Sequence, residues 1–209
     1  MQLRGLIFDL DGTLADNLPT IYQAFRVAFS SVGGQHYTDA EIFDMFGPTE
    51  GAIFQQAMPG RWREALEAYR AAYAAALSSN SFAMPGIGDV LEWLSQQQKL
   101  LAVVTGADTW HAEHTLAALG LAQHFQVVRC GAPGRTKAEN LRYVLQQWRM
   151  APEHIGYVSD SPRDMEIAMD HGVVPLGASW ARSTKADVLY SAGAVQVFDS
   201  PSGLLRWLQ

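Results

Sequence analysis

The sequence predicts an α/β fold, in which a parallel β-sheet flanked by helices carries an inserted all-helical cap subdomain. From residue 82 onward, short apolar runs alternate with stretches of helical periodicity, which is typical of a parallel sheet with helices on its faces. Residues 17–81 interrupt this alternation, since they show helical periodicity alone. We therefore expect a discontinuous Rossmann-like core, residues 1–16 and 82–209, and a helical cap, residues 17–81.

Six short apolar runs are expected to form the strands of the core. One precedes the insertion and five follow it: residues 3–8, 100–104, 125–128, 155–158, 173–176 and 195–198. Runs of this length suit strands that are buried on both faces of a parallel sheet.

Helices between these runs are marked by apolar residues at positions i, i+3, i+4 and i+7. The two clearest stretches are Ile87, Val90, Leu91 and Leu94, followed by Leu141, Val144, Leu145 and Trp148. Helix starts are marked by a capping box at Thr136–Glu139 and by a serine before a first-turn proline at Ser161–Pro162 and Ser200–Pro201.

The insertion carries its helical periodicity in two stretches, residues 18–25 and 62–76. Between them, residues 46–50 (FGPTE) contain glycine and proline, so they form either an ordinary interhelical turn or a loop that points at a functional site in the core. The polar residues 78–81 suit a linker back to the sheet.

The composition of the 209 residues excludes several functional classes. A formal net charge of −6 disfavours a broad nucleic-acid or anionic-membrane surface, because both need clustered Lys and Arg. A single cysteine, Cys130, excludes an intramolecular disulfide and a cysteine-built zinc site. The first residues show no export cleavage pattern, and no run approaches the ~18 apolar residues of a membrane span. We expect a cytoplasmic monomer or homodimer without nucleic-acid or membrane partners.

The strongest local signal is FDLDGTLAD over residues 8–16, which places two carboxylates two residues apart at the end of a predicted buried strand. Asp9 could attack a phosphorus atom, while Asp11 could protonate the leaving oxygen and later deprotonate the attacking water. Gly12 would let the chain turn closely around the ligand, and the Thr13 hydroxyl could donate to a phosphate oxygen.

The same acidic pair implies a metal ion. A dianionic phosphate repels carboxylates, so the arrangement needs a hard cation that takes oxygen ligands and tolerates phosphate, which indicates magnesium. An ordinary strand exit or a calcium loop is the alternative. The calcium loop is disfavoured because the glycine is fourth rather than sixth and no glutamate occupies position twelve.

Three further elements follow predicted strands in the same way: Thr105–Gly106, Lys137, and the pair Asp160 and Asp164. Since ligands bind at the carboxyl ends of strands in an open parallel sheet, these elements should converge with Asp9 on one edge. Lys137 lies in a first helical turn, where a cation is mildly unfavourable, so a phosphate-binding role is preferred over a solvated surface lysine. Asp164 could face the metal, stabilise its helix N-terminus, or do both.

Together, FDLDGTLAD, VVTG, the lysine and SDSPRD, in this order, resemble the haloacid dehalogenase (HAD) superfamily, especially its phosphoglycolate phosphatase-like branch with a helical cap. The resemblance covers nearly the whole chain and implies a HAD-like core. It implies that Asp9 is the nucleophile, Asp11 the acid and base, and Thr105, Gly106 and Lys137 phosphate binders, and that Asp9, the Asp11 backbone carbonyl and Asp160 hold magnesium with support from Asp164. Two departures are Ser159 in place of the usual glycine and the missing proline after Lys137.

The resemblance implies a magnesium-dependent phosphatase that hydrolyses a small phosphorylated metabolite, of the phosphoglycolate or sugar-phosphate type, through an aspartyl-phosphate on Asp9. A phosphomutase of the β-phosphoglucomutase type is the main alternative. A dehalogenase is less favoured, because that chemistry needs no metal and has no use for Asp11. A non-catalytic ligand-binding module is also disfavoured, because the reacting groups are all present.

Two histidines, His111 and His114, lie three residues apart on a predicted helix. No third metal ligand follows them, so we interpret them as part of a solvated helix face and assign them no role.

Overall fold

The computed structural model describes residues 3–78, 82–181 and 183–209. Within these residues, six strands form one parallel sheet in the order β3-β2-β1-β4-β5-β6. The strands are β1 (Gly5–Phe8), β2 (Leu100–Val104), β3 (Val127–Arg129), β4 (Ile155–Ser159), β5 (Val174–Ala178) and β6 (Gln196–Phe198). The predicted parallel α/β architecture is confirmed.

Strand ends differ slightly from the predicted apolar runs. The run at 3–8 enters the sheet only at Gly5, and the run at 125–128 only at Val127. Leu3 and Phe125 precede these strands and still pack against the same hydrophobic cluster. Their apolar character therefore reflects burial rather than strand pairing.

Strand β1 lies near the centre of the sheet, and its register aligns the ends of its neighbours. Phe8, its last residue, pairs with Val103 of β2 and Val158 of β4. The residues that follow these strands therefore emerge at one edge, which is the ligand-binding edge of an open parallel sheet.

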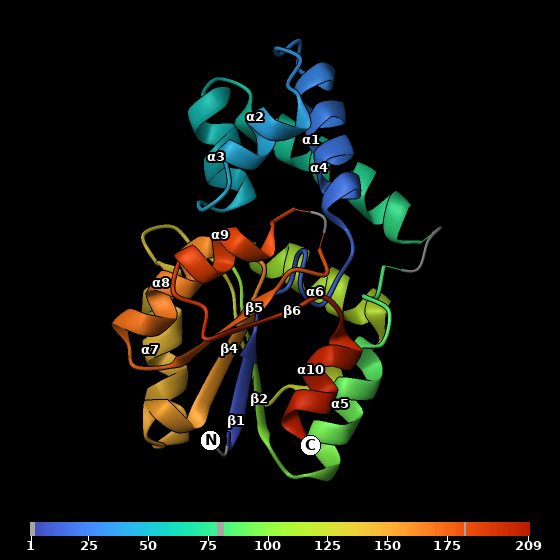
Figure 1. The fold of residues 1–209 in the computed structure, drawn as a ribbon. Coiled ribbons are helices and arrows are strands. Elements are labelled where there is room, and N and C mark those ends of the chain that lie inside the picture. The colour runs from blue at the N-terminus through green and yellow to red at the C-terminus, as the bar shows by residue number, and fades with distance from the viewer. Residues whose placement is uncertain (1–2, 79–81, 182) are drawn as a thin grey trace.

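Helices cover both faces of the sheet (Figure 1). They are α5 (Ile87–Gln96), α6 (Thr109–Leu119), α7 (Lys137–Trp148), α8 (Pro162–Asp170), α9 (Ala186–Ser191) and α10 (Pro201–Leu208), with 3₁₀ turns at Ala122–His124 and Pro152–His154. Leu6 and Phe8 of β1 pack in the cluster that contains residues of α5, α6 and α10, whereas Ile7 packs with residues of α7 and α8. This division follows from the two-residue period of a strand. None of the described helices combines the length and apolar character needed to cross a membrane.

Two of the three predicted helix starts use the expected side-chain cap. The capping box at Thr136–Glu139 opens α7, and Ser200 caps α10. Ser161 stands before the proline of α8, but its side chain makes no capping hydrogen bond. Instead, its backbone N–H donates to the Oγ of Ser159 at 3.1 Å.

Four helices lie within the predicted insertion: α1 (Leu18–Ser31), α2 (Asp39–Asp44), α3 (Glu50–Ala57) and α4 (Trp62–Leu77). We call these four helices the cap. They lie over the carboxyl ends of the strands (Figure 1) and pack around a hydrophobic cluster of their own. Aromatic rings are prominent in it, since Phe25 lies 5.0 Å from Phe54 and 4.8 Å from Tyr69 between ring centroids.

The domain boundaries stay a prediction. The described part of the range 17–81 contains all four cap helices, and the sheet and its own helices lie outside that range. Residues 79–81 of the expected linker lie outside the described chain.

Candidate active site

The predicted site residues gather at the carboxyl edge of the sheet. Asp9 follows β1, Thr105 follows β2, Asp160 follows β4, and Lys137 and Asp164 lie in the first turns of α7 and α8. The Nζ of Lys137 lies 3.0 Å from Oδ2 of Asp9 and 2.7 Å from Oδ2 of Asp164. Three separate segments therefore meet at one ammonium group.

Lys137 is a partly buried cation. Its side chain is only 19% exposed, so the alternative of a solvated surface lysine is wrong. Burial by itself would lower the pKa of Lys137, but the carboxylates of Asp164 and Asp9 outweigh burial and hold that pKa above its ordinary value. Lys137 therefore stays charged and can neutralise a bound anion.

The acidic side chains carry more charge than this lysine can offset. Burial raises the pKa of Asp9 to about 8, despite Lys137, with smaller contributions from Asp164 and Asp160. Burial also raises the pKa of Asp160 to about 6, against the hydrogen bonds from Ser183 and Thr13. A divalent cation would remove this penalty, so Asp9 and Asp160 could hold one.

Asp160 is fixed by two hydroxyl groups. Thr13 Oγ1 donates to Oδ1 of Asp160 at 3.0 Å, and Ser183 Oγ donates to Oδ2 at 2.6 Å. The Thr13 hydroxyl is thus used by Asp160 in this structure, and its donation to a phosphate oxygen stays a prediction. Gly12 has a φ of +79°, and a Cβ there would lie 2.4 Å from Oδ2 of Asp160. This turn therefore requires glycine, because any side chain here would clash with Asp160, a candidate metal ligand.

Ser159, a departure from the family pattern, orients Asp164. Its Oγ donates to Oδ2 of Asp164 at 2.6 Å. Asp164 is 1% exposed, and its Oδ1 has no hydrogen-bond partner within the described residues. Because buried carboxylate oxygens normally have a partner, this atom is a candidate for contact with a metal ion or a water bound to it.

Thr105 and Gly106 lie between the core and the cap. Thr105 is buried, and its Oγ1 accepts from the N–H of Ala107 at 3.1 Å, which leaves the hydroxyl able to donate to a ligand. A Cβ on Gly106 would lie 3.7 Å from the carbonyl oxygen of Gly47 and from Cε of Lys137. The loop at residues 46–50 therefore reaches the site and is more than an interhelical turn.

His111 is the functional candidate that sequence reasoning missed. It is only 1% exposed, so the expected solvated histidine face is wrong at this position, although His114 is exposed. Nε2 of His111 donates to Oδ1 of Asp11 at 2.9 Å, and Nδ1 lies 2.9 Å from the hydroxyl of Tyr69.

Asp11 and His111 form a buried ion pair. Burial by itself would lower the pKa of His111, but the carboxylate of Asp11 outweighs burial and raises that pKa to about 9. Burial would likewise raise the pKa of Asp11, but His111 and the hydrogen bond from Asn17 hold it below its ordinary value. Asp11 is therefore an ionised carboxylate at neutral pH.

The sequence carries no local signal for these added contacts. Tyr69 precedes His111 by 42 residues and belongs to the cap, so the contact between Tyr69 and His111 depends on how the cap packs on the core. Ser183 and Trp180, whose Nε1 donates to the backbone oxygen of Thr13 at 3.1 Å, were also missed. Both lie in the loop after β5, and only its position at the same edge of the sheet could have suggested them.

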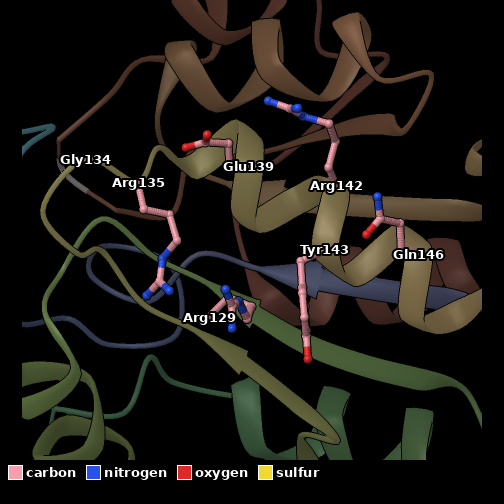
Figure 2. Close-up of a pocket in the computed structure, with 7 residues that line it drawn as sticks. All are labelled: Arg129, Gly134, Arg135, Glu139, Arg142, Tyr143 and Gln146. Carbon is pink, nitrogen blue, oxygen red and sulfur yellow. The ribbon is translucent and has the colours of Figure 1, made fainter.

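A hollow of about 430 Å³ lies beside α7 and is lined by none of the predicted site residues. Figure 2 shows its basic side chains, with Arg142 pointing away from Arg129 and Tyr143. The guanidinium of Arg129 lies 4.0 Å from the centre of the Tyr143 ring. The arginines do not converge on one point, so we assign this hollow no function.

Comparisons with known proteins identify related sequences. Residues 6–178 match a family described as haloacid dehalogenase-like hydrolase. The chain is 25% identical to phosphoglycolate phosphatase of Synechococcus elongatus over 206 residues, covering 98% of this chain and 96% of that protein. It is 32% identical to tyrosine-protein kinase PtkA of Mycobacterium tuberculosis over 180 residues, which cover 84% of this chain and only 62% of the kinase.

A solved structure shares the whole fold. It is described as a predicted phosphoglycolate phosphatase from Haemophilus somnus 129pt, and it superposes with a TM-score of 0.86 at 22% identity. The superposition covers 100% of this chain and 99% of the other. At this identity, the likeness establishes the arrangement of core and cap helices and does not extend to a substrate.

Proposed function

The chain belongs to the haloacid dehalogenase-like hydrolase family, and on this premise we propose that it is a magnesium-dependent phosphatase of small phosphorylated metabolites. The observation that carries the proposal is the meeting of buried Asp9 with Lys137 at 3.0 Å, beside Asp11, at the carboxyl edge of the sheet. A buried carboxylate next to a fixed ammonium group suits attack on a dianionic phosphate ester, because the cation offsets the charge of both partners.

The proposed reaction has two steps that use the same two aspartates. In the first, a carboxylate oxygen of Asp9 attacks phosphorus and the bond to the ester oxygen breaks. Asp11, which is ionised in the free protein and takes up a proton as the substrate binds, delivers that proton to the leaving oxygen. In the second, Asp11 takes a proton from water as the water attacks the aspartyl-phosphate and releases inorganic phosphate. Lys137 and the hydroxyl of Thr105 would stabilise the phosphoryl oxygens throughout.

The donor set fits magnesium. Within the described residues, no three His, Cys, Asp or Glu side chains form a ready-made cation cage. Magnesium usually takes one or two carboxylates and keeps its other positions for water and phosphate oxygens. Asp9, Asp160 and the Asp11 backbone carbonyl would hold it, and Oδ1 of Asp164 would support it. When bound, magnesium would favour the ionised form of Asp9, whose pKa burial raises to about 8, and would hold phosphoryl oxygens.

The proposed substrate is small, of the phosphoglycolate or sugar-phosphate type. One relative is a phosphoglycolate phosphatase, and the carbonyl oxygen of Gly47, in the loop between α2 and α3, lies 3.7 Å from where a Cβ on Gly106 would be. The loop at residues 46–50 would therefore contact a substrate bound at these residues. The proposed place of action is the cytoplasm.

The proposed function is tested by phosphate release from a panel of small phosphate esters, with magnesium and with a chelator. We expect magnesium-dependent release that favours small esters, and chelation should reduce it by about 10²-fold or more, since the metal contributes several kcal/mol. An isomerised sugar phosphate in place of free phosphate would indicate the mutase instead. No turnover of any ester would favour a binding module.

Magnesium is also expected to stabilise the fold, and more strongly near pH 8 than near pH 5.5. At 100 times its Kd, it should add about 2.7 kcal/mol, which corresponds to a rise in Tm of roughly 5–10 °C. The raised pKa values of Asp9 (about 8) and Asp160 (about 6) mean that the folded state holds protons there. In metal-free protein, the stability from these groups is therefore present at low pH and is lost as the pH rises through their folded-state pKa values.

Thermal unfolding with and without magnesium, at both pH values, tests this expectation. Protons compete with the metal near pH 5.5, so the shift should shrink there. Asp160→Asn should lose most of the shift, whereas Asp89→Asn, at an exposed position on α5, should keep it. An equal shift in both variants would contradict the assigned metal ligands.

A further inference from the structure

A buried polar network joins the cap to the core around His111. His111 and Thr115 belong to α6, and Tyr69 and Tyr73 belong to α4 of the cap. The His111 ring stacks on Tyr73 at 4.3 Å between centroids, and the Tyr73 hydroxyl lies 2.9 Å from Oγ1 of Thr115. Glu50, at the start of α3, places Oε1 3.6 Å from Nδ1 of His111.

This network holds one oxygen of Asp11 and leaves the other available. Oδ1 of Asp11 accepts from Nδ2 of Asn17 and from Nε2 of His111. In the described part of the chain, no hydrogen bond reaches Oδ2 of Asp11. Two donors hold Oδ1 in place, so Oδ2 is the oxygen that can carry a proton to a leaving group.

The second nitrogen of the imidazole ties this arrangement to the cap. Nδ1 of His111 is hydrogen-bonded to the hydroxyl of Tyr69, and Glu50 lies on the same side of the ring. Glu50 also accepts from the backbone N–H of Asp108 at 2.9 Å, which anchors the start of α3 to the start of α6. The imidazole therefore bridges the acid of the core and two polar side chains of the cap.

Burying these groups is costly if they serve packing alone. His111, which is 1% exposed, Glu50 and Asp11 all lose contact with water on folding. Apolar side chains in their place would not carry this cost. The ring of His111 stacks on those of Tyr69 and Tyr73. Its two nitrogens, by contrast, are used by Asp11 and by Tyr69 of the cap.

We propose that His111 is a positioning residue that orients the Asp11 carboxylate for proton transfer, and that Tyr69 and Glu50 make this orientation depend on the docked cap. The proposal rests on the phosphatase function proposed above. His111 does not touch the substrate; it acts through Asp11.

The test compares His111→Phe with His111→Gln, using kcat/KM for the two esters of the panel whose leaving groups differ most in pKa. An alkyl leaving group needs the proton from Asp11, whereas a nitrophenyl leaving group departs without it. We expect His111→Phe to lower kcat/KM about 10²-fold for the alkyl ester and less than about 5-fold for the nitrophenyl ester. His111→Gln keeps one hydrogen-bond donor, so it should restore at least about a third of the decrease in log(kcat/KM) for the alkyl ester.

His114→Gln is the matched control. His114 lies on the same helix but is exposed, so its substitution should leave both esters unaffected. An equal loss for both esters in His111→Phe, without recovery in His111→Gln, would overturn the positioning role and leave only packing. Absence of phosphate release by the unmodified enzyme would instead refute the phosphatase function itself.

The dependence on the cap has its own test in double variants. Tyr69→Phe and Glu50→Gln should each slow the alkyl ester several-fold when His111 is present. In the His111→Phe background, neither should slow it further, because both act through the imidazole. Fully additive effects would overturn the link to the cap.

Discussion

Asp9→Asn is expected to abolish phosphate release, with a fall in kcat of at least about 10⁴-fold. The amide that replaces the carboxylate is not a nucleophile towards phosphorus, so no aspartyl-phosphate can form. The fold should survive, because burial raises the pKa of Asp9 to about 8 and the neutral acid already predominates near pH 7 without metal. The thermal midpoint of the metal-free variant should therefore equal or exceed that of the unmodified protein.

Asp16→Asn is the control for this experiment. Asp16 belongs to the same FDLDGTLAD motif but is exposed, so its variant should keep nearly full activity. Steady-state phosphate release and thermal unfolding decide the outcome, with a mass measurement to exclude deamidation of the introduced asparagine back to aspartate. Substantial turnover by an intact Asp9→Asn variant would refute the assigned nucleophile.

Lys137→Met is expected to lower both stability and activity. Removing the ammonium group leaves Asp9 and Asp164 buried without the cation that now lies 3.0 and 2.7 Å from them. Loss of one partner from a buried pair costs about 3–5 kcal/mol. The loss should be smaller near pH 5.5 than near pH 8. Near pH 5.5 Asp9 is protonated in both proteins, whereas near pH 8 it is partly ionised beside Lys137 in the unmodified protein alone.

Activity should fall about 10²-fold or more in the same variant, since a fixed charge at the phosphoryl oxygens is lost. Lys185→Met, at an exposed lysine, should change stability by less than about 0.5 kcal/mol. Asp164→Asn added to Lys137→Met should recover part of the stability and none of the activity. Full activity of Lys137→Met in folded protein would contradict a phosphate-binding role.

The prediction of the sheet succeeded where local pattern and global topology agree. The apolar runs that became β1, β2 and β4 are buried on both faces, so their side chains had to be apolar at nearly every position. The ends of the strands were predicted less accurately, because Leu3 and Phe125 pack in the hydrophobic core without pairing in the sheet.

The candidate site could be assembled from sequence because its residues follow strands. Asp9 and Asp160 each stand directly after a strand of one parallel sheet, and Lys137 begins the next helix after β3. Parallel strands bring such positions to the same edge whatever the details of packing. Their proximity was therefore predictable without knowing a single side-chain conformation.

Short contiguous motifs in the sequence carry the candidate site residues: two aspartates two residues apart, a lysine at a helix start, and a second acidic pair. Only the folded structure shows that His111 is buried against Asp11 and that Thr13 and Ser183 both donate to Asp160. The physical reason is that a hydrogen bond depends on the position of both partners. When the partner comes from the docked cap or from a distant loop, neither spacing nor periodicity along the chain encodes the contact.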